Sequence, residues 1–133
     1  MQFMKTPIIF LLTMFSLPIL IATPVRSETI RVASSGNGDL YYIDTDSIYL
    51  DRSFVKAFVN IKYKKLSSRG VASAAIEWRS QCSYKNYTIN EYNFYGLSGK
   101  LLWSDRKPSS KWKAIKPNSV DEDIYNFMCN FKR

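Results

Sequence analysis

Histidine is absent from this chain of 133 residues. Because histidine is the commonest general base and the commonest metal ligand, its absence argues against most hydrolytic and metal-dependent chemistry. Only five glycines are present, and Gly36 and Gly38 fall in a turn that no helical pattern follows, so a glycine-rich phosphate loop is also missing. We therefore expect a protein that is not an enzyme and that binds no metal or cofactor.

One pair of carboxylates, Asp44 and Asp46, lies close together in the sequence. Two carboxylates fall short of the roughly six to eight oxygen ligands that calcium takes, and in a turn they more often satisfy backbone donors. We therefore interpret them as the end of a strand, followed by a turn or by one short helical turn. A hydrolase that uses Asp44 or Asp46 is the remaining enzymatic alternative.

Long apolar runs are missing except near the N-terminus. There, Lys5 precedes an apolar run over Ile8–Ala22, and a polar stretch with small residues follows. This three-part pattern is typical of a secretory signal peptide. The run is interrupted by Pro18 and is shorter than the roughly 20 apolar residues that an uncleaved membrane anchor needs. We predict a signal peptide over residues 1–27, a single exported domain over residues 28–133 and no membrane span in the mature form.

Cysteine is almost as scarce, with Cys82 in mid-chain and Cys129 near the end. Both lie beyond the predicted signal peptide, and an even number of cysteines in an exported chain favours a disulfide over a metal site or a nucleophilic thiol. We therefore expect a Cys82–Cys129 disulfide that joins a terminal helix to the middle of a sheet.

The strand pattern is centred on the stretch Val71–Cys82, where the side chains alternate between two faces. Trp78 and Cys82 fall on the face that we expect to cover a core. Glu77 falls on the opposite face, which we expect to meet solvent. The alternation predicts a strand at the centre of an antiparallel sheet.

Further strands are predicted on both sides of this central one. A phase slip near Asn90-Glu91 indicates a bulge. Trp103 is expected in the core, and residues 105–116 are expected to form an ordered loop. The other predicted strands are Thr29–Ala33, Leu40–Ile43, Phe54–Tyr63, Tyr87–Tyr95 and Lys100–Trp103.

A helix is predicted at the end of the chain, over residues 120–130. Ser119 is followed three residues later by Glu122, which is the capping-box pattern that begins many helices. Val120 and Ile124 begin an apolar stripe along one side. The expected fold class is therefore α+β: an antiparallel β-meander of five to six strands, with a C-terminal helix packed on one face and one disulfide.

Basic residues outnumber acidic ones by 19 to 11. Removal of Lys5 and Arg26 with the signal peptide leaves 17 basic residues and a net charge of +6. Such a charge favours an anionic partner through long-range attraction, either a protein or a polyanionic macromolecule, and no specific nucleic acid is indicated. A solvated rim that binds nothing is the alternative.

Two clusters of basic side chains are the candidate binding sites. The first follows the predicted Phe54–Tyr63 strand, and the second surrounds a tryptophan that could add aromatic packing to the charge. The first cluster is Lys62, Lys64, Lys65 and Arg69, and the second is Lys107, Lys111, Trp112, Lys113 and Lys116.

Several short segments occur in an order that is similar to a known family. They are the signal pattern, Y-Y-I-D-T-D-S-I at Tyr41–Ile48, a lysine-bearing strand at Phe54–Lys65, Q-C-S-Y-K-N-Y at Gln81–Tyr87, a late tyrosine and glycine segment, and W-K-A-I-K-P-N-S-V at Trp112–Val120. Together they resemble the surface-adhesin protein E family of bacterial exported proteins. The resemblance implies a small antiparallel sheet with a helix, a disulfide at Cys82 and Cys129, and no enzymatic activity.

The resemblance also implies a function, because the family's named member is a surface protein that binds host matrix and serum proteins. We therefore expect a non-enzymatic, adhesin-like bacterial domain that engages host or envelope macromolecules. Its expected location is the periplasm, the cell surface or the medium. The alternative is a soluble periplasmic inhibitor or envelope-maintenance protein. No contact residues can be transferred from the family.

Overall fold

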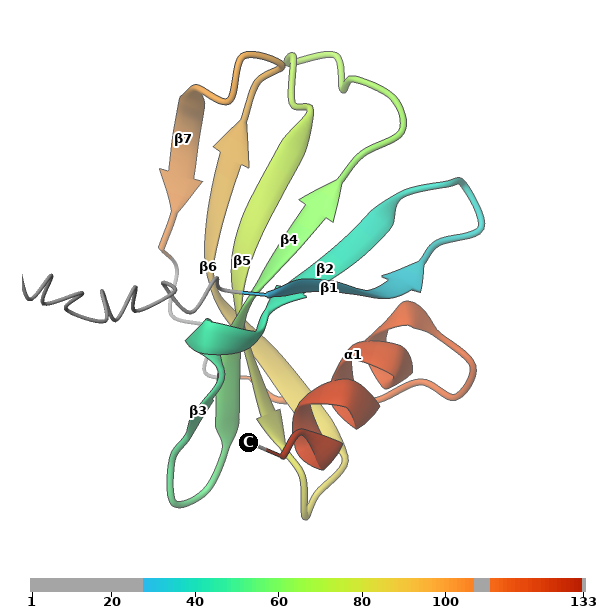
Figure 1. The fold of residues 1–133 in the computed structure, drawn as a ribbon, viewed down its shortest axis with the longest axis vertical. Helices are drawn as coiled ribbons and strands as arrows, with labels where there is room; N and C mark the ends of the chain where they lie inside the picture. The colour runs from blue at the N-terminus through green and yellow to red at the C-terminus, as the bar shows by residue number, and fades with distance from the viewer. Residues whose placement is uncertain (1–27, 107–110, 133) are drawn as a thin grey trace, which may run out of the picture.

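Six strands follow one another along the chain and pair in the same order, so the sheet is an antiparallel meander (Figure 1). The computed structural model describes residues 28–106 and 111–132. The predicted meander is confirmed, whereas the predicted signal peptide and Lys107 lie outside the described residues. The six strands are β1 (Thr29–Ser34), β2 (Leu40–Asp44), β4 (Val55–Lys62), β5 (Ser73–Gln81), β6 (Asn86–Tyr95) and β7 (Leu101–Asp105).

Two further strands are only two residues long. The first, β3 (Tyr49–Leu50), pairs with β4, and the second, β8 (Lys113–Ala114), pairs with β6. The prediction of a loop throughout residues 105–116 is therefore wrong at β8. Two residues are too few to show the alternation by which a strand is recognised in a sequence.

A short 3-10 helix, η1 (Thr45–Ser47), follows β2. The Asp44 side chain caps it by accepting the backbone N–H of Asp46 at 3.0 Å. The expected short helical turn is confirmed, and Asp44 has the capping role that a strand-ending aspartate often takes.

The pairing of β5 with β6 contains the predicted bulge. Glu77 pairs with Glu91 and Trp78 pairs with Ile89, so Asn90 is the extra residue. An extra residue shifts the phase of a strand by one position. Side chains on both sides of the bulge can therefore reach the core face of β6.

The core lies between the sheet and a single helix, α1 (Val120–Asn130), which begins and ends at the predicted residues. The helix packs on β1, β4 and β5 and buries Ile124, Tyr125 and Met128. In Figure 1, α1 lies near the end of the sheet where β5 turns into β6, and the far ends of β5, β6 and β7 extend beyond it. The strands and the turn after η1 contribute Ile43, Ile48, Val55, Ala57, Val59, Ile61, Ala74, Ile76 and Trp78 to the core.

The start of α1 follows the predicted capping pattern at Ser119, while the Glu122 side chain reaches the residue before the cap. Ser119 Oγ accepts the backbone N–H of Glu122 at 3.3 Å, and the Glu122 side chain accepts the backbone N–H of Asn118 at 3.4 Å. Acidic residues in the first turn complement the positive end of the helix dipole. Within residues 28–106 and 111–132, no helix is long and apolar enough to cross a membrane.

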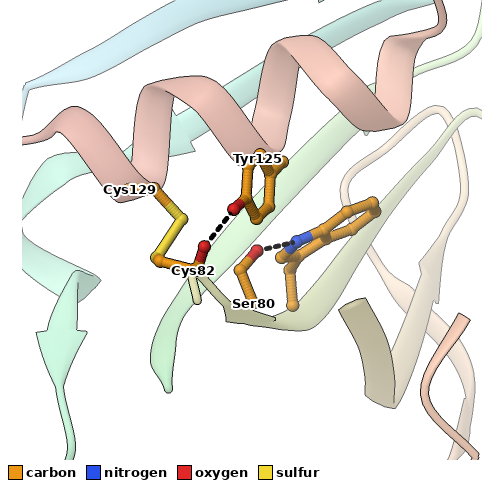
Figure 2. Close-up of a disulfide and its surroundings, with 5 residues drawn as sticks. Ser80, Cys82, Tyr125 and Cys129 are labelled. Atoms are coloured by element: carbon orange, nitrogen blue, oxygen red, sulfur yellow. Dashed lines mark hydrogen bonds between the residues drawn. A yellow bond between two sulfur atoms is a disulfide. The ribbon is translucent and has the colours of Figure 1, made fainter. Parts of the chain in front are cut away.

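The predicted disulfide between Cys82 and Cys129 is present, and it joins residues 47 positions apart (Figure 2). A second link lies beside it, because Tyr125 Oη donates to the Cys82 carbonyl oxygen at 2.5 Å. The last turns of α1 are therefore tied to the beginning of the β5–β6 turn at one covalent and one hydrogen-bonded point.

Trp78 occupies the core as predicted and is 2% exposed. Its ring stacks on Tyr87 with the centroids 4.2 Å apart, and its Nε1 donates to Ser80 Oγ at 2.8 Å. Ser80 is fully buried, so this hydrogen bond satisfies the polar atoms of both side chains in the core.

Two side chains of the central stretch differ from the prediction. Cys82 is exposed because β5 ends at Gln81 and Cys82 begins the following turn. Glu77 was expected to meet solvent but is only 9% exposed. Neighbouring polar side chains cover it: Arg79 Nη2 lies 3.3 Å from Glu77 Oε1, and Asn90 Nδ2 donates to Glu77 Oε2 at 2.9 Å.

Removal of the disulfide should destabilise the mature domain substantially. We expect the Cys82→Ala/Cys129→Ala variant of residues 28–133 to lose about 4 kcal/mol of unfolding free energy, because the unfolded chain is no longer constrained over 47 residues. Urea denaturation followed by circular dichroism measures the loss. Reductant should lower the wild-type protein to the same stability and leave the variant unchanged. Equal unfolding midpoints for the variant and the oxidised wild type would contradict this role.

Candidate functional site

The first predicted basic cluster is divided between two faces of the sheet. Lys62 ends β4 on the face away from the core. The Lys64 side chain lies against Gly38 in the β1–β2 turn, and its backbone N–H donates to Asp39 at 3.0 Å. Lys65 and Arg69 line one pocket together with core-facing side chains of the strands. Lys65 also lines a neighbouring pocket with Lys64 and Asp39.

The second predicted cluster lies at the opposite end of β4. Lys111, Trp112 and Lys113 are exposed, and the Trp112 ring centroid lies 6.4 Å from that of Phe54, which precedes β4. Arg69 belongs to the loop after β4. Since a strand of this length spans roughly 26 Å, the two clusters are separate surfaces.

Lys65 and Arg69 line a pocket of about 290 Å³, called here the Arg69 pocket. Val71 is 5% exposed, which makes it the most buried apolar group there. No residue of α1 lines the pocket, so it lies on the part of the core face that the helix leaves uncovered. Its other lining residues are Tyr63, Ser67, Ser68, Phe94 and Trp103.

The loop that carries Arg69 is braced by its own hydrogen bonds. The Gly70 backbone N–H donates to the Ser67 carbonyl oxygen at 2.9 Å and closes a tight turn. Ser67 Oγ accepts the backbone N–H of Val71 at 3.0 Å and that of Arg69 at 3.3 Å. Gly70 has a φ of 78°, a conformation that glycine adopts at little cost. The backbone of Arg69 is therefore fixed.

The Arg69 guanidinium lies over the ring of Trp103, 4.1 Å from its centroid. The Trp103 ring in turn packs on Phe94, with the centroids 4.9 Å apart. The prediction that Trp103 lies in the core is wrong, because β7 is at the edge of the six-strand order and Trp103 is only half-buried. Sequence reasoning also missed Phe94. The register between β6 and β7 places Phe94 opposite Trp103 and so brings Phe94 to the pocket.

Lys65 and Arg69 of the Arg69 pocket differ from Arg79 and Arg106 in their partners. Arg79 lies 3.3 Å from a carboxylate oxygen of Glu77, and Arg106 lies 3.1 Å from one of Glu91. Among the described residues, no carboxylate forms an ion pair with Lys65 or Arg69. The charges at the pocket are therefore available to a bound anion.

Tyrosines on the core face continue from the pocket toward the helix. Burial raises the pKa of Tyr63, and the neighbouring Tyr41 and Asp39 raise it further. Burial also raises the pKa of Tyr41, with Asp39 as the next cause, and that of Tyr92, with Asp105 as the next cause. These hydroxyls therefore stay protonated at neutral pH and can donate hydrogen bonds.

The arrangement is suited to binding. The pocket combines two cations, hydroxyl groups and apolar walls, and its lining includes no carboxylate and no histidine that could serve as a general base. Among residues 28–106 and 111–132, no group of three or more acidic, cysteine or histidine side chains could hold a metal ion. A ligand with an anionic group beside an apolar group would match the lining.

The fold and the pocket define a class of protein: a small α+β domain, closed by one disulfide, with a cationic and aromatic pocket on an uncovered part of its sheet. The sequence match is more specific. Residues 30–130 match the family model described as "Surface-adhesin protein E". The chain belongs to this family, as its short segments indicated, and is an adhesin-like protein. The family is one of surface adhesins and is not an enzyme family.

Solved structures support the same fold. The structure of Haemophilus influenzae protein E in crystal form II is 20% identical in sequence, has a TM-score of 0.58, and the match covers 79% of this chain and 89% of that one. The crystal structure of protein E from non-typeable Haemophilus influenzae is 21% identical with a TM-score of 0.53, covering 80% and 78%. At these identities the likeness establishes the fold. No curated protein matches the sequence.

The tyrosine under α1 should make stability fall at high pH. Burial, together with the nearby Asp121, raises the pKa of Tyr87 to about 12, and its Oη donates to Asp121 Oδ2 at 3.0 Å. The unfolded chain loses this proton near pH 10, so unfolding becomes easier as the pH rises from about 10 to 12. The Tyr87→Phe variant should show a shallower decline in urea midpoint over this range.

The exposed Tyr84 provides the control for this measurement. We expect the Tyr84→Phe variant to follow the wild-type pH dependence. If Tyr87→Phe and wild type decline in parallel between pH 10 and 12, the hydrogen bond to Asp121 does not cause the pH dependence.

Proposed function

We propose that residues 28–133 form an exported, non-enzymatic binding protein that engages a host or envelope macromolecule through the Arg69 pocket. The observation that carries this proposal is the pair of cations, Lys65 and Arg69, which lie beside an apolar pocket without an ion-pairing carboxylate among the described residues. Family membership supports it, since the family is named for surface adhesins.

Export is supported by two features of the chain. The N-terminal sequence has the charged, apolar and small-residue regions of a signal peptide. The Cys82–Cys129 disulfide is of a kind that persists in oxidising compartments and is rare in the cytosol. We propose cleavage after Ser27 and a mature protein in the periplasm, at the cell surface or in the medium.

Binding should be sensitive to salt and to the two pocket cations. We expect the mature protein to bind at least one member of a panel of purified matrix proteins and heparin in 0.1 M salt. Binding should be lost at 1 M salt, where the screening length falls from about 10 Å to about 3 Å. The Lys65→Ala/Arg69→Ala variant should bind at least about tenfold more weakly in biolayer interferometry.

The second basic cluster supplies a control with the same change in net charge, Lys111→Ala/Lys113→Ala. Its affinity should stay within about twofold of wild type, because these residues lie at the other end of β4. Salt-sensitive binding that only this second variant loses would move the site to the Trp112 surface. No salt-sensitive binding to any member of the panel would overturn the binding function.

Cell fractionation tests the proposed location separately. An adhesin should be accessible to antibody on intact cells, whereas a soluble periplasmic inhibitor or envelope-maintenance protein should be released with the periplasm. A periplasmic inhibitor or envelope-maintenance protein would bind an envelope partner through the same Arg69 pocket. A chain that is found only in the cytosol, with both thiols reactive before reduction, would contradict export.

A further inference from the structure

We propose that the Arg69 pocket holds an extended acidic segment of a partner protein, with one apolar side chain inside the pocket and a neighbouring carboxylate on Arg69. This inference rests on the proposed binding function and specifies the chemistry that the partner presents at one site. It follows from the size of the pocket, from the way Arg69 is held and from the balance of charge around it.

The size of the pocket limits what can enter it. Its volume of about 290 Å³ is just below the roughly 300–1,000 Å³ of small-molecule sites, so it has room for one or two amino-acid side chains. Val71 and Phe94 provide apolar surface inside it, and burial of an apolar side chain there is favourable because that surface leaves water. A large cofactor or several sugar rings would exceed the space.

Arg69 is prepared to bind a carboxylate. The Ser67–Gly70 turn fixes its backbone, and the Trp103 ring supports its guanidinium at 4.1 Å. A guanidinium that lies over a ring keeps the N–H groups at its edge available, and two of them can donate in parallel to one carboxylate. Since the side chain is already ordered, less conformational entropy is lost when the carboxylate binds.

The charge around the pocket favours an anionic partner with more than one acidic group. Lys65 supplies a second cation, and the Tyr63 hydroxyl supplies a neutral donor beside it. Glu77 and Glu91 elsewhere on the sheet are engaged by other arginines. Asp39, which lies near Tyr63 and lines the neighbouring pocket with Lys65, accepts the backbone N–H of Lys64. An acidic segment that crosses the pocket would therefore meet two cations and no competing internal ion pair among the described residues.

The same lining favours a polypeptide over a polysaccharide. Sugar rings need an open aromatic face, whereas Arg69 covers one face of Trp103 and the Phe94 ring packs 4.9 Å away. A sulfated polysaccharide gains most from a dense row of cations, and only two line this pocket. Apolar walls beside two cations match an apolar residue flanked by glutamate or aspartate.

A designed peptide tests the assignment. The probe is a fluorescein-labelled Gly-Ser-Glu-Leu-Glu-Phe-Glu-Ser-Gly peptide, measured by fluorescence anisotropy with residues 28–133 in 0.05 M salt. A second peptide has glycine in place of leucine and phenylalanine, so that its charge is unchanged. We expect the first peptide to bind and the second to bind about tenfold or more weakly. Amide resonances of Val71 and Arg69 and the Trp103 indole resonance should shift on binding.

Protein variants locate the peptide on the surface. Arg69→Ala should weaken binding of the first peptide about tenfold or more, and Arg69→Lys should restore only part of it, since lysine cannot form two parallel hydrogen bonds. Arg52→Ala is the matched control, because Arg52 is exposed in the β3–β4 loop at the other end of β4. It should change the affinity by less than about twofold.

Four results would overturn the pocket assignment. They are no binding of the first peptide, equal binding of the charge-only peptide, equal losses for Arg69→Ala and Arg52→Ala, and a heparin tetrasaccharide that occupies the same resonances with the same dependence on Arg69. The last result would assign the pocket to a polysaccharide. If matrix proteins bind the wild type while the peptide does not, the binding function stands and only the acidic-segment inference fails.

Discussion

The link between Cys82 and Cys129 determines which part of the sheet the helix can cover. It fixes the C-terminal turn of α1 at the point where β5 becomes β6, and the Tyr125 hydrogen bond holds the same place. An 11-residue helix is about 16 Å long, whereas the ten residues of β6 extend over roughly 33 Å. A helix held at one end of such a sheet must leave the other end uncovered. The position of the Arg69 pocket follows from that limit.

The uncovered end of the sheet is built from side chains that are partly buried in the core and partly exposed to solvent. Tyr63, Tyr92 and Trp103 are each partly buried and partly exposed, and the Ser67–Gly70 turn brings Arg69 over the ring of Trp103. The loop thus replaces the helix as a partial cover. A cover made by one charged side chain excludes less water than a helix, and for that reason this end can receive a ligand.

Much of the fold could be predicted because its signals are local. The Ser119 cap and the apolar stripe indicated both ends of α1, and alternation with a phase slip indicated the strands and the bulge near Asn90-Glu91. The site could be predicted only in part, because its residues come from separate strands. Lys62 and Lys65 are close in sequence but lie on different faces, while Phe94 and Trp103 meet through register. The burial of Glu77 was also missed, since the side chains that cover it are Arg79, two residues further along β5, and Asn90 of β6.

The distribution of the three tryptophans gives the molecule three separate optical reporters. Trp78 is buried against Tyr87, Trp103 lies beneath a guanidinium, and Trp112 is exposed next to Phe54. Their indole emission should therefore fall at different wavelengths and respond differently to a soluble quencher. Fluorescence from one unlabelled sample can then distinguish loss of the core from occupation of the pocket and from contact at the opposite end.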